Sequence, residues 1–508
     1  MGFTDLNKTK KTDGSDDVFI KGPTSHFGEI LTVSPVPVAQ GEFVYNFIAL
    51  DVFNTGSFSG ADINASSGMA ELSSSTDVSG SALLELRRGL KYRPGQGSLM
   101  RATALFDTPV ENNRQLVGIS NREAGYTWGY DGTNFGVLHT QKGQVEIRKY
   151  VVSAGANTEA VTVTLNGNST VVNLIGGGDT TQTAYQLANQ DYSDVGYGWT
   201  ADAVGSTVFF LSSQPRDDLG GAFSIAGTAI DGTFSQVVAG SGSTETFVPT
   251  GSFNNDKLDG TGPSGMVLNP QKGNVYQVGF QYLGFGNARF DVEDPDTGIF
   301  IKAHELKLTN SRTSPVVKNP QMRPSLESCN RGNNTNVVLK TASMASFTEG
   351  VVRNLDPKFS KAVTFASAND NDFLDQPILA IKTNSVFRDQ TCGGEFDLLA
   401  INCSNENTAK TLTVGFFLDE PIGGDVNFEY VDENISLVST AVLTPGTNTI
   451  ANLNAIPFYT FSVAPLSAVT IDLVPLAFVF PTNSTLIIAF KSSQSIAGNL
   501  SLNWFEQQ

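Results

Sequence analysis

Charged residues are scarce in this chain of 508 residues. They form 16% of the sequence, whereas soluble domains carry about 25%. The 32 basic and 50 acidic residues give a formal net charge of −18. Nucleic acids and anionic membrane surfaces are both bound through clustered Lys and Arg. The charge balance therefore argues against a nucleic-acid partner and against binding to an anionic membrane.

Cysteine is also rare, and the three cysteines are Cys329, Cys392 and Cys403. An odd and small number in a chain of this length means that no disulfide framework carries the fold. Cys392 and Cys403 could pair across neighbouring strands. Isolated buried thiols are the alternative that we favour.

Histidine occurs only three times, as His26, His139 and His304. A Ser-His-Asp or Cys-His site would have to use one of them. His26 falls in a polar N-terminal stretch, whereas His139 and His304 fall in expected strands without a GxSxG turn nearby. A zinc site would need clustered His and Cys, which the sequence lacks. We therefore expect no catalytic residues, no enzyme activity and no cofactor.

Long apolar runs are absent, because none approaches the 18 residues that a membrane-spanning helix needs. The first residues, MGFTDLNKTKKTDGSDD, lack the apolar stretch of a secretory signal peptide. We expect a soluble chain that does not insert into a membrane and is not exported.

Glycine and phenylalanine, by contrast, are abundant, with 50 and 34 residues. From Gly28 onward, short segments such as EFVYNFIAL, SLMRATALF and FGVLHT alternate with Gly-, Pro- and Asn-rich turns. Many short strands with such spacing are typical of sandwiches and barrels. The predicted fold class is mainly all-β, with antiparallel jelly-roll-like β-sandwiches and one small inserted α+β module. No fixed-period repeat is evident, which disfavours a propeller or a β-helix.

Changes in pattern divide the chain into five expected parts. The first residues are polar, and Pro315, Pro320 and Pro324 interrupt the chain further on. The predicted domains are an N-terminal arm (1–28), a split β-sandwich (29–149 plus 251–320), an inserted α+β module (150–250), a β-rich connector (321–370) and a C-terminal β-sandwich (371–508).

The inserted module carries the clearest local signals. VTVTLNG and STVVNLI predict a hairpin that turns at Asn166-Gly167, a strong turn dipeptide. TTQTAYQLANQ is the best helix candidate, with Asp179 as its N-cap and Gln182 as the other half of a capping box. The three glycines before it, Gly176–Gly178, could approach an anion. They lack a Lys and the Walker spacing, so a tight turn is the favoured interpretation.

A second glycine pattern, Gly260–Gly265, matches GxGxxG literally. A dinucleotide site needs this pattern between a strand and a helix. Here Pro263 removes one backbone donor and no helix signal follows, so the segment predicts a loop.

Two acidic clusters are the candidates for a metal site. The first surrounds the turn DPDTG and includes Asp291 and Glu293, and the second precedes the last domain and includes Asp375. The calcium-ligand candidates are Asp294, Asp296, Asp370 and Asp372. Ca²⁺ takes six to eight oxygen ligands, but Asp and Asn are also preferred turn residues, and solvated turns are the favoured alternative.

Aromatic residues cluster at Tyr126, Trp128 and Tyr130. Exposed rings of this kind could stack on a sugar. Packing in the core of a sandwich is the favoured interpretation. Paired carboxylates for glycoside hydrolysis cannot be recognised in sequence, because their separation is set by the tertiary structure.

The chain resembles virion structural proteins of tailed bacteriophages and of some large DNA viruses. The segments that carry the resemblance are Tyr92–Gly97 (YRPGQG), Gly129–Thr133 (GYDGT) with Phe135–Gly136, Asp259–Met266 (DGTGPSGM), Tyr276–Gly286 (YQVGFQYLGFG) and Leu502–Glu506 (LNWFE). The TAYQLANQ helix and the GTFSQVVAG strand look like modules of phage tail and appendage proteins. The resemblance is one of pattern, so it carries over no site residues.

The resemblance implies a non-enzymatic structural role in a viral particle, as a tail fibre, appendage, vertex or capsid-surface protein that attaches to a host. The particle would assemble in the host cytoplasm, and the arm would contact other virion proteins. A glycan-binding adhesin or lectin is the alternative, followed by a tailspike-type glycan depolymerase. We expect a homo-oligomer, because the low charge leaves apolar strand faces to be covered. A trimer is expected because phage appendages are commonly trimeric.

Overall fold

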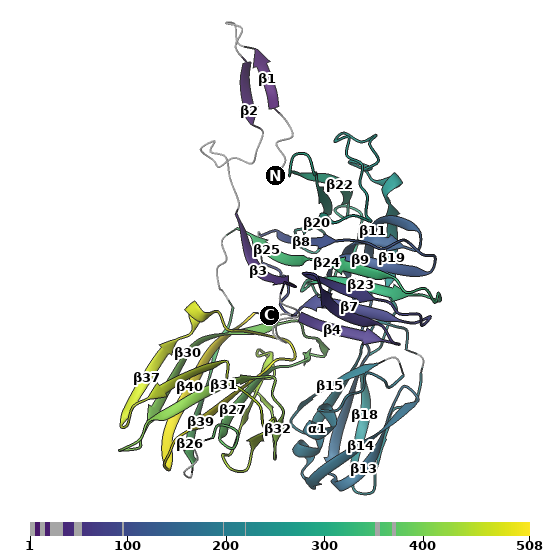
Figure 1. The fold of residues 1–508 in the computed structure, drawn as a ribbon. Coiled ribbons are helices and arrows are strands. Elements are labelled where there is room, and N and C mark those ends of the chain that lie inside the picture. The colour runs from purple at the N-terminus through teal and green to yellow at the C-terminus, as the bar shows by residue number, and fades with distance from the viewer. Residues whose placement is uncertain are drawn as a thin grey trace. The chain divides into compact units, whose positions relative to one another are not determined.

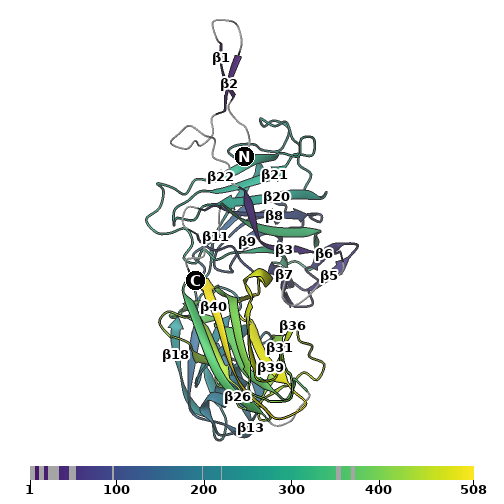
Figure 2. The same cartoon turned by 90° about the vertical axis from the view of Figure 1, so that its left-hand side faces the viewer.

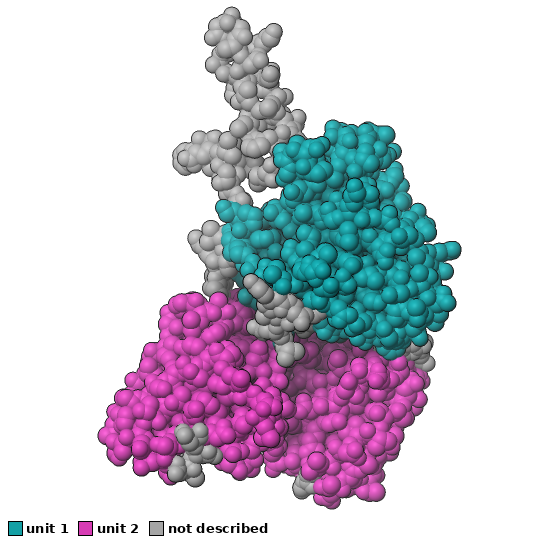
Figure 3. Space-filling model, in the orientation of Figure 1, with its two compact units in different colours: residues 1–142, 244–353 teal, residues 143–243, 354–508 magenta. Residues whose placement is uncertain are grey.

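Antiparallel β-sheets make up most of the structure, as the alternating segments predict. The computed structural model describes residues 6–10, 16–20, 34–44, 53–93, 96–196, 198–218, 220–350, 356–367 and 372–507. These fall into two units, Met1–Lys142 with Thr244–Arg353 and Gly143–Ser243 with Asn354–Gln508 (Figure 3). Within the described ranges, no helix is long and apolar enough to cross a membrane.

Unit 1 is built around two large antiparallel sheets (Figure 1). The seven-stranded sheet has the order β19 (Thr244–Pro249), β11 (Asn134–Gln141), β10 (Gly125–Asp131), β9 (Asn113–Ser120), β23 (Arg323–Asn330), β7 (Ser81–Leu86) and β4 (Phe53–Phe58). The six-stranded sheet has the order β22 (Phe300–Leu306), β21 (Ala288–Glu293), β20 (Asn274–Phe280), β8 (Ser98–Ala104), β25 (Ser343–Glu349) and β3 (Pro35–Glu42).

Trp128 lies in the core between these two sheets. It projects from β10 and is fully buried, with its ring 5.7 Å from Phe290 of β21 and 5.4 Å from Tyr276 of β20. Its indole Nε1 donates to the Gln277 carbonyl at 3.2 Å. Tyr126 and Tyr130 are buried beside it. The aromatic cluster therefore packs the core, as the sequence analysis favoured.

Smaller sheets complete unit 1. They are a three-stranded sheet of β24 (Val338–Thr341), β6 (Met69–Ser73) and β5 (Asp62–Ser66), and a two-stranded ribbon of β1 (Leu6–Lys10) and β2 (Asp16–Ile20). The ribbon pairs Leu6 with Ile20 and lies in the expected arm 1–28. The other residues of the arm lie outside the described residues.

The prediction of a β-rich connector over 321–370 is wrong for the first part of this range. β23 lies inside the seven-stranded sheet between β9 and β7, while β24 and β25 join two other sheets of unit 1. The prediction relied on Pro324 as a chain breaker. Pro324 is only the second residue of β23, and pairing with β7 starts one residue later, at Ser325. The missing N–H therefore costs no ladder bond on that side.

The first part of unit 2 is the module between Lys142 and Thr244. It has a four-stranded sheet with the order β15 (Trp199–Val204), β16 (Thr207–Ser212), β12 (Ile147–Ala154) and β18 (Asp231–Val238). A three-stranded sheet follows with the order β14 (Asn168–Gly177), β13 (Asn157–Leu165) and β17 (Ser224–Ala226). The helix α1 (Thr180–Ala188) buries Ala184 and Leu187 in the module's own core.

The hairpin turn, the Asp179 N-cap and the glycine turn of the module are confirmed, while the capping-box role of the Gln182 side chain stays a prediction. Asn166 and Gly167 both adopt positive φ, 49° and 82°, in the two-residue turn between β13 and β14, as a type I′ hairpin requires. The Asp179 carboxylate accepts from the amides of Thr181 and Gln182 at 2.7 and 3.0 Å. Gly178 makes the tight turn before α1 with φ 84°.

The second part of unit 2 is an antiparallel sandwich (Figure 2). One sheet has the order β26 (Lys358–Ser367), β40 (Ile496–Gln507), β30 (Glu395–Asn405) and β37 (Ser467–Asp472), with β38 (Val479–Pro481) also on β30. The other has the order β33 (Glu429–Tyr430), β34 (Val438–Val442), β27 (Pro377–Thr383), β39 (Thr485–Lys491), β31 (Leu412–Leu418) and β36 (Tyr459–Val463). Two short ribbons pair β28 (Val386–Phe387) with β29 (Gln390–Thr391) and β32 (Ile422–Gly423) with β35 (Thr449–Ile450). The 3-10 turns are η1 (Thr250–Ser252) in unit 1 and η2 (Val474–Leu476) here.

One core joins the faces of this sandwich. Trp504 of β40 and Phe396 of β30 are buried with Ile381 of β27 and Ile488 of β39. The predicted fold class, mainly all-β with antiparallel jelly-roll-like sandwiches and one α+β module, is confirmed.

Gly129→Ala is expected to destabilise unit 1 by about 3 kcal/mol. A Cβ on Gly129 would lie 1.8 Å from the Gln115 carbonyl oxygen on the neighbouring strand β9. Gly56→Ala, in the same sheet, is the matched control, because nothing lies within 4 Å of its Cβ position. Its stability should stay within about 1 kcal/mol of the wild type. Chemical denaturation checks both, and similar losses for the two variants would contradict the close approach at Gly129.

Candidate functional site

The candidate site is a cleft of about 290 Å³ in unit 2, where the module meets the sandwich. α1 and β15 supply one wall, with Tyr185 and Asp202. β27, the turn after β31 and the segment before β33 supply the other, with Lys382, Glu420 and Phe428. The volume is at the lower end of the range for small-molecule sites, which starts near 300 Å³.

A buried ion pair forms the floor of the cleft. The ammonium of Lys382 bonds to Asp202 Oδ1, and it also donates to the Ala203 carbonyl at 2.8 Å. Asp202 Oδ2 accepts from the backbone amide of Ser385 at 2.7 Å. Lys382 Nζ also lies 4.6 Å from the centre of the Phe428 ring. The ammonium and the carboxylate therefore both have their partners inside the protein.

Three more contacts join α1 and β15 to the sandwich at this cleft. The Gly205 amide, next to β15, donates to the Phe428 carbonyl at 2.7 Å. The Tyr185 ring lies 6.1 Å from the Phe428 ring. The Tyr185 hydroxyl bonds to the Ile422 backbone and the Asn189 side chain, while burial raises its pKa. The walls of the cleft are thus held in place.

The carboxylates of Asp419 and Glu420 lie at the rim of the cleft. Asp419 is exposed, and its Oδ1 accepts from the Thr485 amide at 2.7 Å. Glu420 is half-buried, and its Oε2 accepts from Asn452 Nδ2 at 2.9 Å. Among the described residues that line the cleft, Lys382 is the only basic one. The rim is therefore rich in acceptors, and a molecule that binds there has to bring donors.

No sequence motif marks this cleft, because its residues come from distant turns. The one usable signal was Lys382, a charge inside the apolar strand PILAIKT. A buried charge needs a partner, so this lysine predicts an acid close by. The sequence does not say that the acid is Asp202 of the module.

His139 packs inside unit 1. Its ring stacks on Tyr126 at 5.0 Å, with 12° between the planes. The side chain is 2% exposed, and Nε2 has no hydrogen-bond partner among the residues that the structure describes. Burial, with a smaller contribution from Arg312, lowers the His139 pKa to about 4. The ring is therefore neutral at neutral pH.

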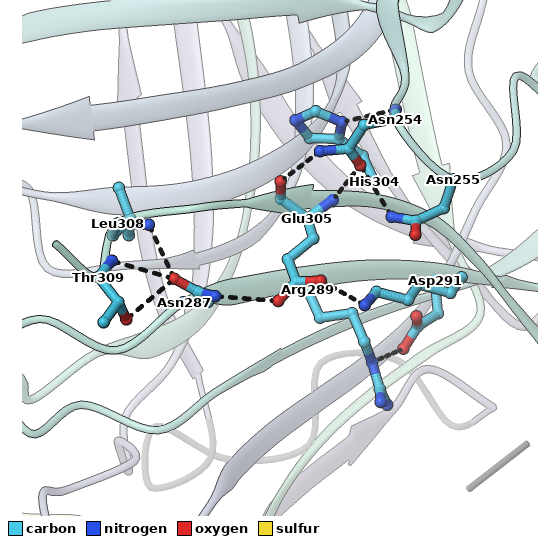
Figure 4. Close-up of polar contacts among 10 residues, drawn as sticks. Asn254, Asn255, Asn287, Arg289, Asp291, His304, Glu305, Leu308 and Thr309 are labelled. Atoms are coloured by element: carbon cyan, nitrogen blue, oxygen red, sulfur yellow. Dashed lines mark hydrogen bonds and ion pairs between the residues drawn. The ribbon is translucent and has the colours of Figure 1, made fainter. Parts of the chain in front are cut away.

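His304 is likewise part of the framework (Figure 4). Its Nδ1 accepts from the Asn254 amide at 3.3 Å, and its ring stacks on Phe253 at 5.3 Å. The Asn254 side chain pairs with the backbone of Glu305, donating to its carbonyl at 2.8 Å and accepting from its amide at 3.0 Å. Burial lowers the His304 pKa. His26 lies outside the described residues.

The acidic residues near the DPDTG turn separate in the structure. Asp291 is buried, accepts from Arg289 Nε at 2.8 Å and has its pKa raised by burial (Figure 4). Both carboxylate oxygens of Asp294 accept hydrogen bonds within its own turn. Oδ1 accepts from the Asp296 amide, and Oδ2 accepts from the Thr297 hydroxyl. These carboxylates therefore do not converge on one point.

The other calcium candidates lie elsewhere. Asp372 accepts from the Leu374 amide at 3.1 Å, and Asp370 lies outside the described residues. Within the described part of the chain, no three His, Cys, Asp or Glu side chains come close enough together to hold a metal ion. Calcium binding at Asp294, Asp296, Asp370 and Asp372 stays a prediction.

The remaining sequence candidates have structural roles. Gly260–Gly265 is a loop in which the Ser264 amide donates to buried Asp256 at 2.8 Å, as predicted. No disulfide joins Cys392 to Cys403; Cys329 and Cys403 are buried, and Cys392 is half-buried.

The chain matches no protein-family model and no curated protein sequence. Several solved β-rich structures are partly similar. One comes from work on endo-acting O-glycanases with which human gut microbiota initiate mucin breakdown (TM-score 0.29, 9% identity, 61% of this chain and 99% of that chain). Another is peanut lectin with a peptide (TM-score 0.25, 10% identity, 63% of this chain and 100% of that chain). A third comes from work on the triple jelly roll fold and turret assembly in an archaeal virus (TM-score 0.16, 8% identity, 94% of this chain and 98% of that chain).

At such low TM-scores and identities, no activity, ligand or assembly is carried over to this chain. The chain is a mainly all-β protein of antiparallel sandwiches, and its function has to be argued from its own residues.

Lys382→Met is expected to destabilise unit 2 by roughly 3–5 kcal/mol, because it leaves the Asp202 carboxylate buried without its cation. Lys340→Met is the matched control. It breaks a 2.7 Å ion pair with Glu71 in which both side chains are about a third exposed, so it should cost less than about 1 kcal/mol. Thermal and urea unfolding measure both. Replacing both partners, Lys382→Met with Asp202→Leu, should recover most of the loss, and equal small effects of the two single variants would contradict this role.

His139 should make unit 1 less stable in acid. The unfolded chain binds a proton near pH 6.5 and the folded chain only near pH 4, so stability falls as the pH drops between these values. The effect approaches roughly 3 kcal/mol at the lower end. Urea unfolding of the wild type and His139→Phe at several pH values measures it. The difference between the two proteins should change across this window, and a pH-independent difference would contradict the low pKa.

Proposed function

We propose that this chain is a structural, non-enzymatic component of a viral particle, such as a tail fibre, appendage or vertex protein, and that it self-associates. The pattern resemblance, the low charge and the mainly β architecture support this proposal. The observation that carries it is a largely apolar edge of the C-terminal sandwich, formed by residues 453–476, in which Asp472 is the one charged residue. We call this surface the apolar edge.

The apolar edge lies where both sheets of the sandwich end. β36 is the last strand of one sheet order and β37 of the other. Leu453 and Ile456 are 82% and 81% exposed. The other exposed apolar side chains of this segment are Phe458, Leu466, Val474 and Leu476. Asp472 is the only charged residue between Glu433 and Lys491.

This edge lacks the usual protection against pairing. Edge strands present unpaired backbone groups, which proteins commonly guard with charged side chains. Exposed apolar patches mark interaction sites. Since the chain carries a net charge of −18, two copies repel each other except where their surfaces are uncharged. A second copy of this chain is therefore the partner that the edge fits best.

The copy number, the contacts of the arm and the attachment to a host belong to the same proposal. Three copies follow from the resemblance to phage appendages. Contacts of the arm 1–28 with other virion proteins, and attachment to host glycans, would complete the role. A glycan-binding adhesin or lectin is the second candidate, and the cleft of unit 2 is the observation that favours it. A glycan depolymerase of the tailspike kind has less support, because such enzymes usually show a long parallel β-helix, whereas the large sheets of the described residues are antiparallel.

Ile456→Asp is expected to weaken self-association at least about tenfold, since it places a buried charge in the contact. Ile175→Asp is the control, because Ile175 is 72% exposed on β14, away from the apolar edge. Light scattering over a wide concentration range measures both. The wild type and Ile175→Asp should stay oligomeric, while Ile456→Asp shifts toward the 54.1 kDa monomer. A monomeric wild type, or equal effects of the two variants, would contradict the proposal.

The particle role has its own test. Mass spectrometry of purified particles, with electron microscopy of particles labelled against this chain, should find it in every particle at fixed positions. Its absence from particles would refute the virion role.

A further inference from the structure

We propose that the cleft of unit 2 binds one neutral sugar ring of a glycan. The inference deepens the glycan-binding part of the proposed function by naming the site and the ligand class. It is tested on the free chain, so its failure is separate from a failure of self-association.

The charges of the cleft disfavour a charged ligand. Asp419 and Glu420 place two carboxylates on the rim, which repel an anion. The Lys382 ammonium cannot turn to an anion, because it is bonded to Asp202 and to the Ala203 carbonyl. A cation loses its hydration on entering the cleft, and an ion pair at an exposed rim returns little free energy. A neutral ligand meets neither the repulsion nor this loss.

The polar groups of the cleft call for hydroxyl donors. Carboxylates only accept hydrogen bonds, and bonds to ionised acceptors are stronger than neutral ones. The amide side chains of Asn189 and Asn483 also line the cleft, where Asn189 bonds to the Tyr185 hydroxyl and Asn483 Oδ1 accepts from the Ser385 hydroxyl. A polyol can donate to Asp419 and Glu420 while it exchanges bonds with the amides.

Another part of the lining is apolar. Tyr185 and Ala188 contribute it from α1, and Pro421 and Ile422 contribute it from the facing turn. A pyranose presents hydroxyls at its rim and C–H groups on its faces, so it matches both kinds of lining. The volume of about 290 Å³ limits the buried part of the ligand to about one ring.

The ligand test uses one ring with three charges. Saturation-transfer NMR and calorimetry on the full chain compare N-acetylglucosamine, cationic glucosamine below neutral pH, and anionic glucuronate, together with the methyl glycosides of glucose, galactose and mannose. At least one neutral sugar should bind in the millimolar range, as expected for so small a ligand, and more tightly than both charged rings. Binding of no neutral sugar to the folded chain, or tighter binding of a charged ring, would overturn the proposal.

The variants place the binding in the cleft. Glu420→Gln should weaken it about tenfold, the usual loss for one bond to a charged group. Glu406→Gln is the matched control, since Glu406 is exposed in the same unit and also bonds an asparagine, Asn499. Ala188→Phe fills the cleft and should abolish binding even if Glu420→Gln is poorly folded. Unchanged binding in Ala188→Phe, or equal losses in the two glutamate variants, would overturn the assignment to this cleft.

Discussion

The pairing of β11 with β19 is the constraint on which the rest of the chain depends. Gln141 lies directly opposite Thr244, so the chain leaves unit 1 and returns to it at adjacent positions. The whole module can therefore be inserted without opening the sheet. Unit 1 needs residues from both sides of the insertion, because β23 fills the position between β9 and β7. Its pairings are thus long-range, and we expect folding to be slow for that reason.

Low charge shapes the rest of the molecule. Several buried charges are paired, as in the Lys382–Asp202 bond that joins the module to the sandwich, and as in Arg114 between Asp131 and Glu245. Strand faces are covered by apolar side chains, many of them phenylalanines. Where the sheets of the C-terminal sandwich end, the low charge leaves an apolar edge with Asp472 as its one charged residue. The proposed self-association and the sparse use of charge thus have one origin in the sequence.

Much of the fold could be predicted from local patterns. Alternating segments marked the strands, Asn166-Gly167 marked the hairpin, and Asp179 marked the start of α1, because these signals act over a few residues. The error at Pro324 arose because proline was taken as a breaker, whereas its cost depends on which neighbouring strand needs the missing N–H. Both neighbours of β23, β9 and β7, are far away in the sequence.

The site could not be predicted in the same way. Lys382, Asp202 and Glu420 come from three distant segments, and only the tertiary structure brings them to one cleft. Their residue types are ordinary for strands and turns. Lys382 alone was unusual, and it indicated only that a buried partner exists. The apolar edge was foreseen merely as a shortage of charge, without a location.

Cryo-electron microscopy of the assembled full-length chain tests the central claim most directly. The account predicts that residues 453–476 lie in the contact between copies, with β36 and β37 covered, and that the cleft of unit 2 stays open to solvent. A reconstruction in which this edge faces solvent, and another surface joins the copies, would contradict the account.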